Sequence, residues 1–294
     1  MKRINIYFRQ LFIIFFLIFC FMNEAHSQVK DTIKRKKPGF FVGFSIGPSQ
    51  TNIKNIGTLS ISKLSSNAQN AYFGSVEFGY LFSNYFGLSS GINYISYKSQ
   101  LLLDAYQNSY NTIDSENDAF EMRITGSNIK EIQTANILSI PICINLQMPV
   151  SKKVGLYFKG GINMAFPLSQ KYTSSGTFTY KGFYPAYNDL LENLPAYGFP
   201  TDKSFSFSGQ MKLKTMGVSP IISAGLDYAV KKKMKVAIGF NYNSTLLGVN
   251  DGSTSTDKIQ LSPDAEHINS FVGGSSKITA QSIGVEITLR YYLK

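Results

Sequence analysis

Strict alternation of apolar and polar side chains over long segments is the feature that most constrains how this chain can fold. Successive side chains of a β-strand point to opposite faces, so such a segment has one apolar and one polar face. Similar alternation recurs at residues 40–48, 71–83, 85–98, 138–148, 154–166, 216–230, 236–243 and 282–291. The clearest apolar set is Ile283, Val285, Ile287, Leu289 and Tyr291. The pattern predicts about eight strands, several of them longer than the average strand of roughly five or six residues.

Long and short connections alternate between the predicted strands. Long ones span residues 49–70, 99–133, 169–211 and 248–277, and short ones lie near Asn84, at 149–153 and at 231–233. Transmembrane barrels have short periplasmic turns and long outer loops, whereas structureless loops of this length are uncommon in compact soluble domains. We therefore predict an all-β fold, an antiparallel up-and-down transmembrane β-barrel of about eight strands. It would lie in the outer membrane of a Gram-negative bacterium, and the alternative is a secreted β-sandwich.

The first 27 residues have the composition of a secretory signal peptide. Lys2, Arg3 and Arg9 form a basic start, Leu11–Met22 is apolar, and Ala25–Ser27 precedes a cleavage site. The apolar run is too short for a membrane anchor, which needs about 20 residues. We expect a signal peptide at 1–27, a basic periplasmic linker at 28–39 and the outer-membrane β-barrel at 40–294.

The net charge of +11 is unevenly distributed over the predicted topology. The linker, the short connections and the C-terminus hold eleven basic residues and one acidic residue, whereas the long connections hold nine basic and 13 acidic residues. The basic excess on the periplasmic rim can meet lipid phosphates or keep the turns solvated. Nucleic-acid binding would need cations interleaved with aromatic side chains on one surface. We expect outer-membrane lipids and the outer-membrane assembly machinery as partners, and no nucleic acid.

Five charged residues fall on the polar faces of predicted strands, toward their periplasmic ends. They are Glu77, Lys159, Asp227, Glu286 and Arg290. A barrel of eight strands leaves room inside only for packed side chains, and buried charges are costly unless they are paired. We predict a lumen charge network of salt bridges and hydrogen bonds. The alternative is a gated ion path or a small-solute site.

Aromatic side chains are concentrated in the predicted outer loop 169–211, where they could bind a partner. The candidates are Tyr180, Phe183, Tyr184, Tyr187, Tyr197 and Phe199. Because alternation continues in this loop, we also expect Thr177–Lys181 to pair with Ser204–Ser208 as a hairpin that extends beyond the membrane. The aromatic residues could serve both roles.

Residues that could carry out catalysis are few. Glu266, His267 and Ser270 could support acyl transfer, but they lie in a loop rich in Ser, Gly and Asp with no predicted strand to hold their geometry. Cys143 has no nearby base and is expected to be a small buried filler. The sequence has no phosphate-binding glycine loop and no metal-ligand spacing. We therefore expect no catalytic residues, no cofactor, no metal and no enzymatic activity.

The alternating strands, the alternating connection lengths and the aromatic residues near the C-terminus resemble the PorT-like outer-membrane β-barrel domains of Bacteroidota. Segments Gly87–Tyr94 and Ser223–Ala229 are similar to that family's recurring pattern of glycine, aliphatic, polar and aromatic residues. The resemblance covers about residues 40–294 and implies an eight-stranded barrel on the plan of OmpA and OmpX. It implies location and architecture, since a fold does not determine an activity.

We accordingly expect a non-enzymatic outer-membrane protein with a packed lumen, which presents its long outer loops for envelope structure or for binding a partner or ligand. One alternative is an accessory component of outer-membrane secretion or assembly, which the name-giving member of the PorT-like group suggests. That role would make an envelope protein complex a partner. A second alternative is a lipid-modifying outer-membrane enzyme.

Overall fold

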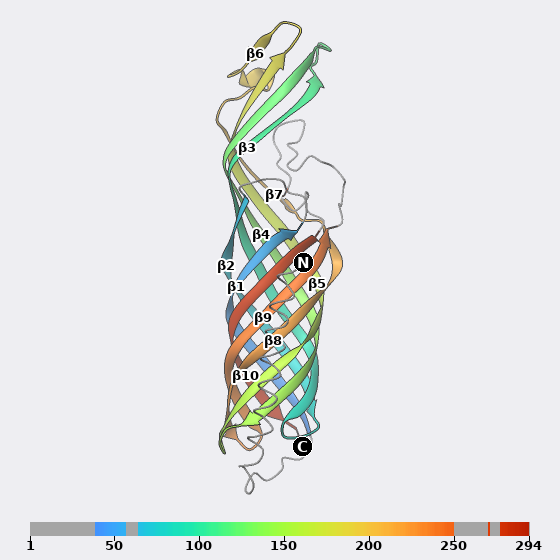
Figure 1. The fold of residues 1–294 in the computed structure, drawn as a ribbon, viewed down its shortest axis with the longest axis vertical. Helices are drawn as coiled ribbons and strands as arrows, with labels where there is room; N and C mark the ends of the chain where they lie inside the picture. Colours follow the sequence, from blue (N-terminus) through green and yellow to red (C-terminus); the bar gives the residue numbers. More distant parts are fainter. Residues whose placement is uncertain (1–38, 57–63, 250–269, 271–276, 294) are drawn as a thin grey trace, which may run out of the picture. The chain divides into compact units, whose positions relative to one another are not determined.

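The computed structural model describes residues 39–56, 64–249, 270 and 277–293, all within one unit, Pro38–Lys294 (Figure 1). The predicted signal peptide and all of the basic linker except Gly39 lie outside the described residues. Among the described residues, no helix is long and apolar enough to cross a membrane. The elements are β1 (Gly39–Ile56), β2 (Leu64–Leu81), β3 (Phe86–Ile113), β4 (Ala119–Pro149), β5 (Val154–Tyr184), β6 (Asp189–Leu191), the 3-10 helix η1 (Pro195–Tyr197), β7 (Lys203–Gln210), β8 (Leu213–Lys231), β9 (Met234–Val249) and β10 (Lys277–Tyr292).

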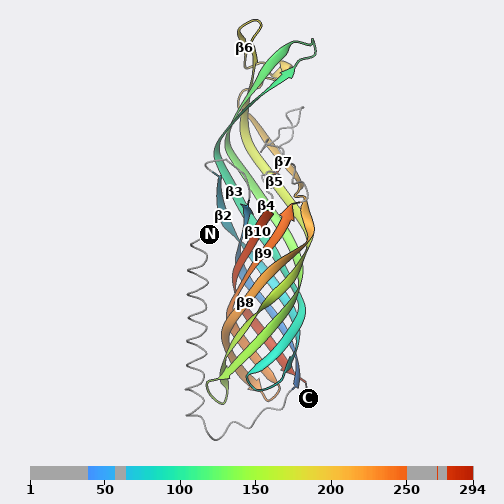
Figure 2. The same cartoon turned by 45° about the vertical axis from the view of Figure 1, so that its right-hand side comes forward.

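Eight of these strands close into a ring (Figures 1 and 2). Each ring strand pairs antiparallel with its neighbours, in the order β1, β2, β3, β4, β5, β8, β9, β10 and back to β1. The ring strands follow one another along the chain, and β6 and β7 pair with β5 outside the ring. The predicted antiparallel up-and-down barrel is therefore confirmed.

The ring strands place small and polar side chains inside the barrel and apolar side chains outside. In β10, Glu286 and Arg290 are buried, whereas Ile283 and Ile287 are 58% and 56% exposed. A soluble protein would bury the isoleucines and expose the charges. The reversed pattern is that of a barrel whose outer wall contacts lipid chains. The period-2 sequence pattern thus gives one lipid-facing and one lumen-facing side to each strand.

Two of the short turns are closed by serine side chains. The Ser83 hydroxyl oxygen accepts hydrogen bonds from the N–H groups of Tyr85 and Phe86 at 3.2 and 3.1 Å. Ser151 accepts bonds from Lys153 and Val154 in the same way, at 3.3 and 3.1 Å. A serine hydroxyl that satisfies backbone donors favours a tight turn over continued strand. These turns join β2 to β3 and β4 to β5 at the periplasmic end.

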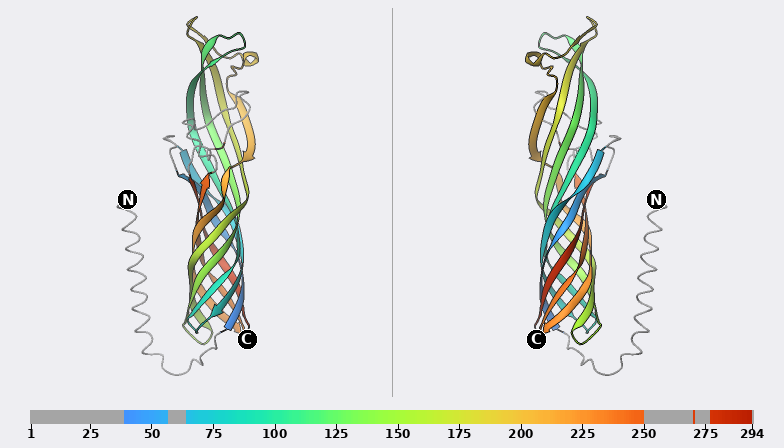
Figure 3. Two further views of the ribbon diagram at one scale, coloured as in Figure 1. Left: turned by 90° about the vertical axis from the view of Figure 1, so that its right-hand side faces the viewer. Right: turned by 90° about the vertical axis from the view of Figure 1, so that its left-hand side faces the viewer.

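The outer connections differ from the sequence prediction. β3, β4 and β5 contain 28, 31 and 31 residues, although a strand needs only about 10 residues to cross the membrane. The expected loops 99–133 and 169–211 are therefore mostly strand, and β3 turns into β4 at Asp114–Asp118. We call residues 104–128 and 172–210 the outer extension. Figure 3 shows it continuing β3, β4 and β5 beyond the ring.

The predicted hairpin within residues 169–211 forms with a different register. β7 pairs with residues 171–178 of β5, so that Thr177 faces Ser204 and Thr173 faces Ser208. The prediction paired Thr177 with Ser208 and Lys181 with Ser204. Lys181 instead faces Arg123 of β4. The two segments therefore pair as a hairpin, displaced by four residues along β5.

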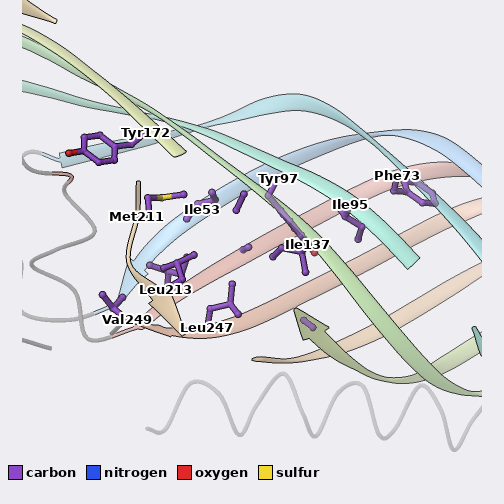
Figure 4. Packing of buried hydrophobic residues seen from close by; sticks show 14 residues of the cluster. Ile53, Phe73, Ile95, Tyr97, Ile137, Tyr172, Met211, Leu213, Leu247 and Val249 are labelled. Atoms are coloured by element: carbon purple, nitrogen blue, oxygen red, sulfur yellow. The ribbon is translucent and has the colours of Figure 1, made fainter. Parts of the chain in front are cut away.

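An apolar cluster fills the ring where the outer extension begins. Figure 4 shows Tyr97, Ile137 and Leu247 in one cluster with Met211 and Leu213, which lie near the start of β8. A smaller cluster of Phe41, Leu81 and Tyr292 lies at the periplasmic end. The charged residues near the periplasmic end of the lumen lie between these two apolar layers.

Candidate functional site in the lumen and the outer extension

All five residues of the predicted lumen charge network lie inside the barrel, each less than 8% exposed. They come from β2, β5, β8 and β10, and each lies within a few residues of the periplasmic end of its strand. The alternation that points apolar neighbours toward lipid points these side chains inward. Their contacts fall into three groups, centred on the carboxylates Glu77, Glu286 and Asp227.

The first group is centred on the buried carboxylate of Glu77. Arg290 Nη2 lies 3.3 Å from Glu77 Oε2, and Lys159 Nζ lies 3.8 Å from the same oxygen. The Ser89 hydroxyl donates to Glu77 Oε1 at 2.5 Å, and the Asn145 amide donates to the Ser89 oxygen at 2.6 Å. The Glu77 carboxylate therefore partly compensates the charges of Arg290 and Lys159, and the Ser89 hydroxyl orients it. Buried charges need such ion pairs and hydrogen bonds to offset the cost of removing them from water.

The second and third groups include residues that the sequence prediction did not name. The Tyr157 hydroxyl donates to Glu286 Oε1 at 2.7 Å. Lys235 Nζ lies 2.8 Å from Asp227 Oδ1 and 3.3 Å from Gln147 Oε1. The sequence could have indicated that Lys235 faces the lumen, because alternate residues of a strand share a face and Ala237 and Gly239 of β9 face inward.

The lumen is filled at the level of these groups. The free space beside Glu77, Lys159, Asn93 and Cys143 is about 20 Å³, which is room for about one water molecule. Cys143 is buried in the wall of this space. Apolar clusters lie on either side of this level, toward the outer end and at the periplasmic end.

A further buried carboxylate lies deeper toward the outer end, where the sequence analysis assigned a loop. Glu131 is fully buried and accepts hydrogen bonds from Gln133 at 2.6 Å, Ser174 at 2.8 Å and Ser270 at 2.7 Å. Of the three residues considered for acyl transfer, Ser270 alone is described, and Glu266 and His267 lie outside the described residues. Ser270 thus has a structural role here, as a donor to the carboxylate of Glu131.

The aromatic residues of the outer extension mostly pack against one another. Phe120 stacks on Tyr184 with ring centres 5.0 Å apart, and Phe199 meets Phe120 edge-on at 5.8 Å. Among the six candidates, Tyr180 and Phe199 are 1% and 3% exposed, so they stabilise the extension and cannot reach a partner. Phe183 lies under the guanidinium of Arg123 at 4.3 Å. Tyr187 and Tyr197, at 66% and 76% exposed, are the candidates available for contact.

The turn at the tip of the extension is held by Asp114. Its carboxylate accepts hydrogen bonds from the N–H groups of Glu116 and Asp118, each at 2.9 Å, and from the Tyr184 hydroxyl at 3.1 Å. These donors lower the pKa of Asp114, and the N–H of Asp118 is the largest cause. Asn117 completes the turn in the left-handed conformation, with φ of 69°, which asparagine tolerates better than most residues. The tip is therefore an ordered turn linked to β5.

Comparison with known proteins supports this architecture. The family model described as the outer membrane protein beta-barrel domain matches residues 27–251. Curated proteins yield no match. Among solved structures, the outer membrane protein OprG from Pseudomonas aeruginosa is 16% identical over 89% of this chain and 99% of its own, with a TM-score of 0.36. The neisserial surface protein NspA is 10% identical over 89% of this chain and 100% of its own, with a TM-score of 0.35.

A third solved structure corrects the expectation of no enzymatic activity. OmpT from Escherichia coli, an outer membrane protease, is 9% identical over 90% of this chain and 99% of its own, with a TM-score of 0.29. The expectation of no enzymatic activity is corrected accordingly, because neither the fold nor the absence of familiar motifs is a ground against catalysis.

Proposed function

The chain belongs to the outer membrane protein β-barrel domain family, and from this premise we propose that it is a barrel with a filled lumen whose outer extension binds a partner protein. Family membership confirms the predicted location in the outer membrane. The filled lumen supports this proposal over conduction, because the interior is occupied by paired charges and apolar layers.

The edge of β3 in the outer extension is the observation that carries the proposal. On one side, residues 105–113 pair with residues 119–127 of β4. On the other side, β2 pairs with β3 only as far as Leu103, and none of the described residues pairs with 107–113. Among the described strands, this part of β3 therefore lies at an edge, above the ring.

The direction of the backbone groups follows from the hydrogen bonds of the turn. The N–H of Asp114 donates to the C=O of Asp118 at 3.0 Å, and bonded residues alternate along an antiparallel pair. Every second residue before Asp114 consequently points its N–H and C=O away from β4. The residues with outward-pointing backbone groups are Gln107, Ser109, Asn111 and Ile113.

Such a row of backbone groups accepts a strand from another polypeptide. Natural edge strands often block this pairing with Pro or Lys, and residues 104–113 contain neither. The described residues of the extension contain eight acidic and three basic residues. We infer that the partner supplies an extended segment with basic side chains, and that the exposed rings of Tyr187 and Tyr197 add contact area near the tip.

We also propose that the chain belongs to a particular group within the family. The strand patterns of Gly87–Tyr94 and Ser223–Ala229 favour the PorT-like group of Bacteroidota. In that group an accessory role in outer-membrane secretion or assembly is the second candidate, and it would make the partner a member of an envelope complex. The signal peptide at 1–27, the basic linker at 28–39 and recognition by the outer-membrane assembly machinery also remain proposals.

The test uses a photo-crosslinking residue in place of Tyr110, which is 42% exposed on the edge strand. Irradiated cells are compared for three forms, namely the otherwise native chain, a Gln107→Pro/Asn111→Pro variant and a Gln107→Ala/Asn111→Ala control. Proline removes an N–H that points away from β4, so the extension keeps its own hydrogen bonds while strand addition is blocked.

The proposal predicts one discrete protein adduct with the native and alanine forms, which disappears in the proline form. All three forms should shift on unheated gels as folded barrels do. The proposal is contradicted if no discrete protein adduct forms, or if the proline form gives the same adduct as the alanine form. The identity of the adduct, whether an assembly or secretion component or another protein, distinguishes the two candidate roles.

A further inference from the structure

Acidic and basic side chains on the outer half of this barrel lie at different levels along the barrel axis. The described residues include 12 acidic residues, of which four lie in the lumen and eight lie in the outer extension. None of these faces outward from the ring wall. Several lysines do face outward near the outer end of the ring, Lys54 among them, and four of these lysines form two pairs across a single intervening residue. We call Lys98, Lys171, Lys214 and Lys277 the lysine collar.

The strand register arranges the lysine collar in two pairs. Lys98 of β3 and Lys171 of β5 both face Thr134 of β4, which lies between them. Neighbouring strands are about 4.8 Å apart, so these two lysine backbones are separated by roughly 10 Å across a small residue. The register thus makes a two-lysine cradle on the outer wall.

The second pair has the same form. Lys277 of β10 faces Gly248 of β9, and the side chain of Lys214 from β8 lies over that glycine. A Cβ on Gly248 would be 2.7 Å from Lys214 Cδ, so a larger residue there would displace the lysine. Glycine therefore leaves the space in which Lys214 and Lys277 lie on either side of one residue.

The lipid-facing wall begins just below each lysine. On the periplasmic side of each collar lysine, an exposed apolar side chain lies two to six residues away along the same strand. These side chains are Ile92 on β3, Leu168 on β5, Met216 on β8 and Ile283 on β10. A lysine at this height can extend its ammonium group to the headgroup layer while its alkyl chain stays against the wall. Among the described residues, no carboxylate forms an ion pair with any of the four ammonium groups.

We propose that the lysine collar binds the phosphate groups of phosphorylated glycolipid in the outer leaflet of the outer membrane. Each pair offers two cations across a small residue, a spacing that suits an anionic headgroup seated against the wall. The acidic extension above and the apolar wall below limit the site to the level of the headgroups. A basic side chain near an anionic membrane surface strengthens binding by about fivefold.

The test measures glycolipid retention by the full-length protein purified from outer membranes in a zwitterionic detergent. The probes are purified lipid A and the same lipid after enzymatic removal of its phosphates, and bound lipid is counted by native mass spectrometry. Two variants, Lys98→Gln/Lys171→Gln and Lys214→Gln/Lys277→Gln, are compared with Lys152→Gln/Lys153→Gln. The control removes the same charge from the periplasmic turn between β4 and β5. Gel mobility without heating verifies that every form is folded.

The proposal predicts that each collar variant weakens lipid A binding by about 25-fold at the altered pair and leaves the other pair occupied, whereas the periplasmic control binds as the native protein does. Removal of the phosphates should weaken binding at both pairs and so reduce lipid retention below that of either collar variant. Equal retention of both lipids by the native protein would overturn the proposal. So would collar variants that bind lipid A as the native protein does, or a control variant that loses as much binding as they lose.

Discussion

Tyr157 and Glu286 are 129 residues apart in the sequence, and the Tyr157 hydroxyl donates a 2.7 Å hydrogen bond to the buried Glu286 carboxylate. The bond crosses the lumen from β5 to β10. It requires the aromatic ring of Tyr157 to pass close to the backbone of β9. A Cβ on Gly239 would lie 2.2 Å from the Tyr157 hydroxyl oxygen, so glycine is required where the Tyr157 side chain passes β9. The lumen is therefore packed by contacts between strands that are not neighbours.

Replacing Tyr157 by Phe tests this bond. The variant keeps the ring but leaves a buried carboxylate without this donor, which typically costs about 1–3 kcal/mol. We expect the free energy of unfolding in urea to fall by that amount for the barrel in lipid vesicles. Tyr228→Phe, which alters a half-exposed side chain on the outer wall, should change it by less than about 0.5 kcal/mol. Equal losses in the two variants would contradict this role for Tyr157.

Glu77→Ala should be the more damaging change in the lumen. It leaves Arg290 and Lys159 buried beside each other without their shared carboxylate, and breaking a buried ion pair typically costs about 3–5 kcal/mol. Glu121→Ala removes the partner of Arg123 in the outer extension, where both groups are partly exposed, and should cost less than about 1 kcal/mol. The measurement is the temperature at which the fast-migrating folded band is lost. A Glu77→Ala barrel as heat-resistant as the native one would refute this account of the lumen.

Gly182→Val should loosen the outer extension without opening the ring. A Cβ at Gly182 would lie 2.5 Å from the ring of Phe199, which packs over β5 and also contacts Phe120. Displacing Phe199 should expose the segment 185–202 to added protease, while the folded band on unheated gels remains. The double variant Gly182→Val/Phe199→Ala removes the clash but also the packing, so it should be cleaved as well. Gly74→Ala, where a Cβ would meet only the Ser45 backbone oxygen at 3.8 Å, serves as the control that leaves Phe199 in place. Unchanged protease resistance in Gly182→Val would count against this packing.

The Asp114 turn should depend on pH. Its pKa is lowered in the folded protein, chiefly by the N–H of Asp118, so the ionised carboxylate stabilises the turn above the ordinary aspartate pKa of about 3.9. That stabilisation is lost as the pH falls through the lower folded value. We expect hydrogen-exchange protection of the Asp118 amide to decrease over that acid range in the native protein. Asp114→Asn should abolish the pH dependence, and an unchanged dependence in that variant would contradict the assignment.

The membrane-spanning part of the fold could be predicted because lipid outside and polar side chains inside give a strong contrast along each strand. Residues 282–291 show this contrast throughout, and they lie within β10 as predicted. In the outer extension the contrast disappears. Residues 107–112 of β3 are polar on both faces except for Tyr110, because both faces meet water or other polar groups there. A period-2 signal is then absent even though the strand continues.

The alternation of inward- and outward-facing residues in β4 is interrupted at Asn128, which is a second reason why the outer extension could not be predicted from the sequence. Below Asn128, Ile129, Glu131 and Gln133 of β4 point inward, and above it the inward residues become Ile124 and Gly126. Asn128 itself has a φ of 51°, so the alternation changes parity at that residue. Glu131 was consequently counted as a loop charge, although it is a buried acceptor.

The lumen charges could be predicted from their parity, but their partners could not. Tyr157 of β5 and Gln147 of β4 contact residues of β10 and β9, strands that do not pair with their own, and alternation alone does not reveal such contacts. Two residues of the lysine collar, Lys171 and Lys277, were counted in the charge totals of whole loops, where acidic residues offset them, and Lys98 and Lys214 fell outside those loops. Only the register of the strands separates these lysines from the acidic residues by their level along the barrel axis.

Ion conductance in planar lipid bilayers tests the central claim, that the lumen is filled and the function lies in the outer extension. The purified native protein should insert without producing stable conductance steps, because paired charges and two apolar layers occupy the bore. Stable, reproducible steps from the folded native barrel would contradict the account, since they would show a continuous aqueous path through the lumen.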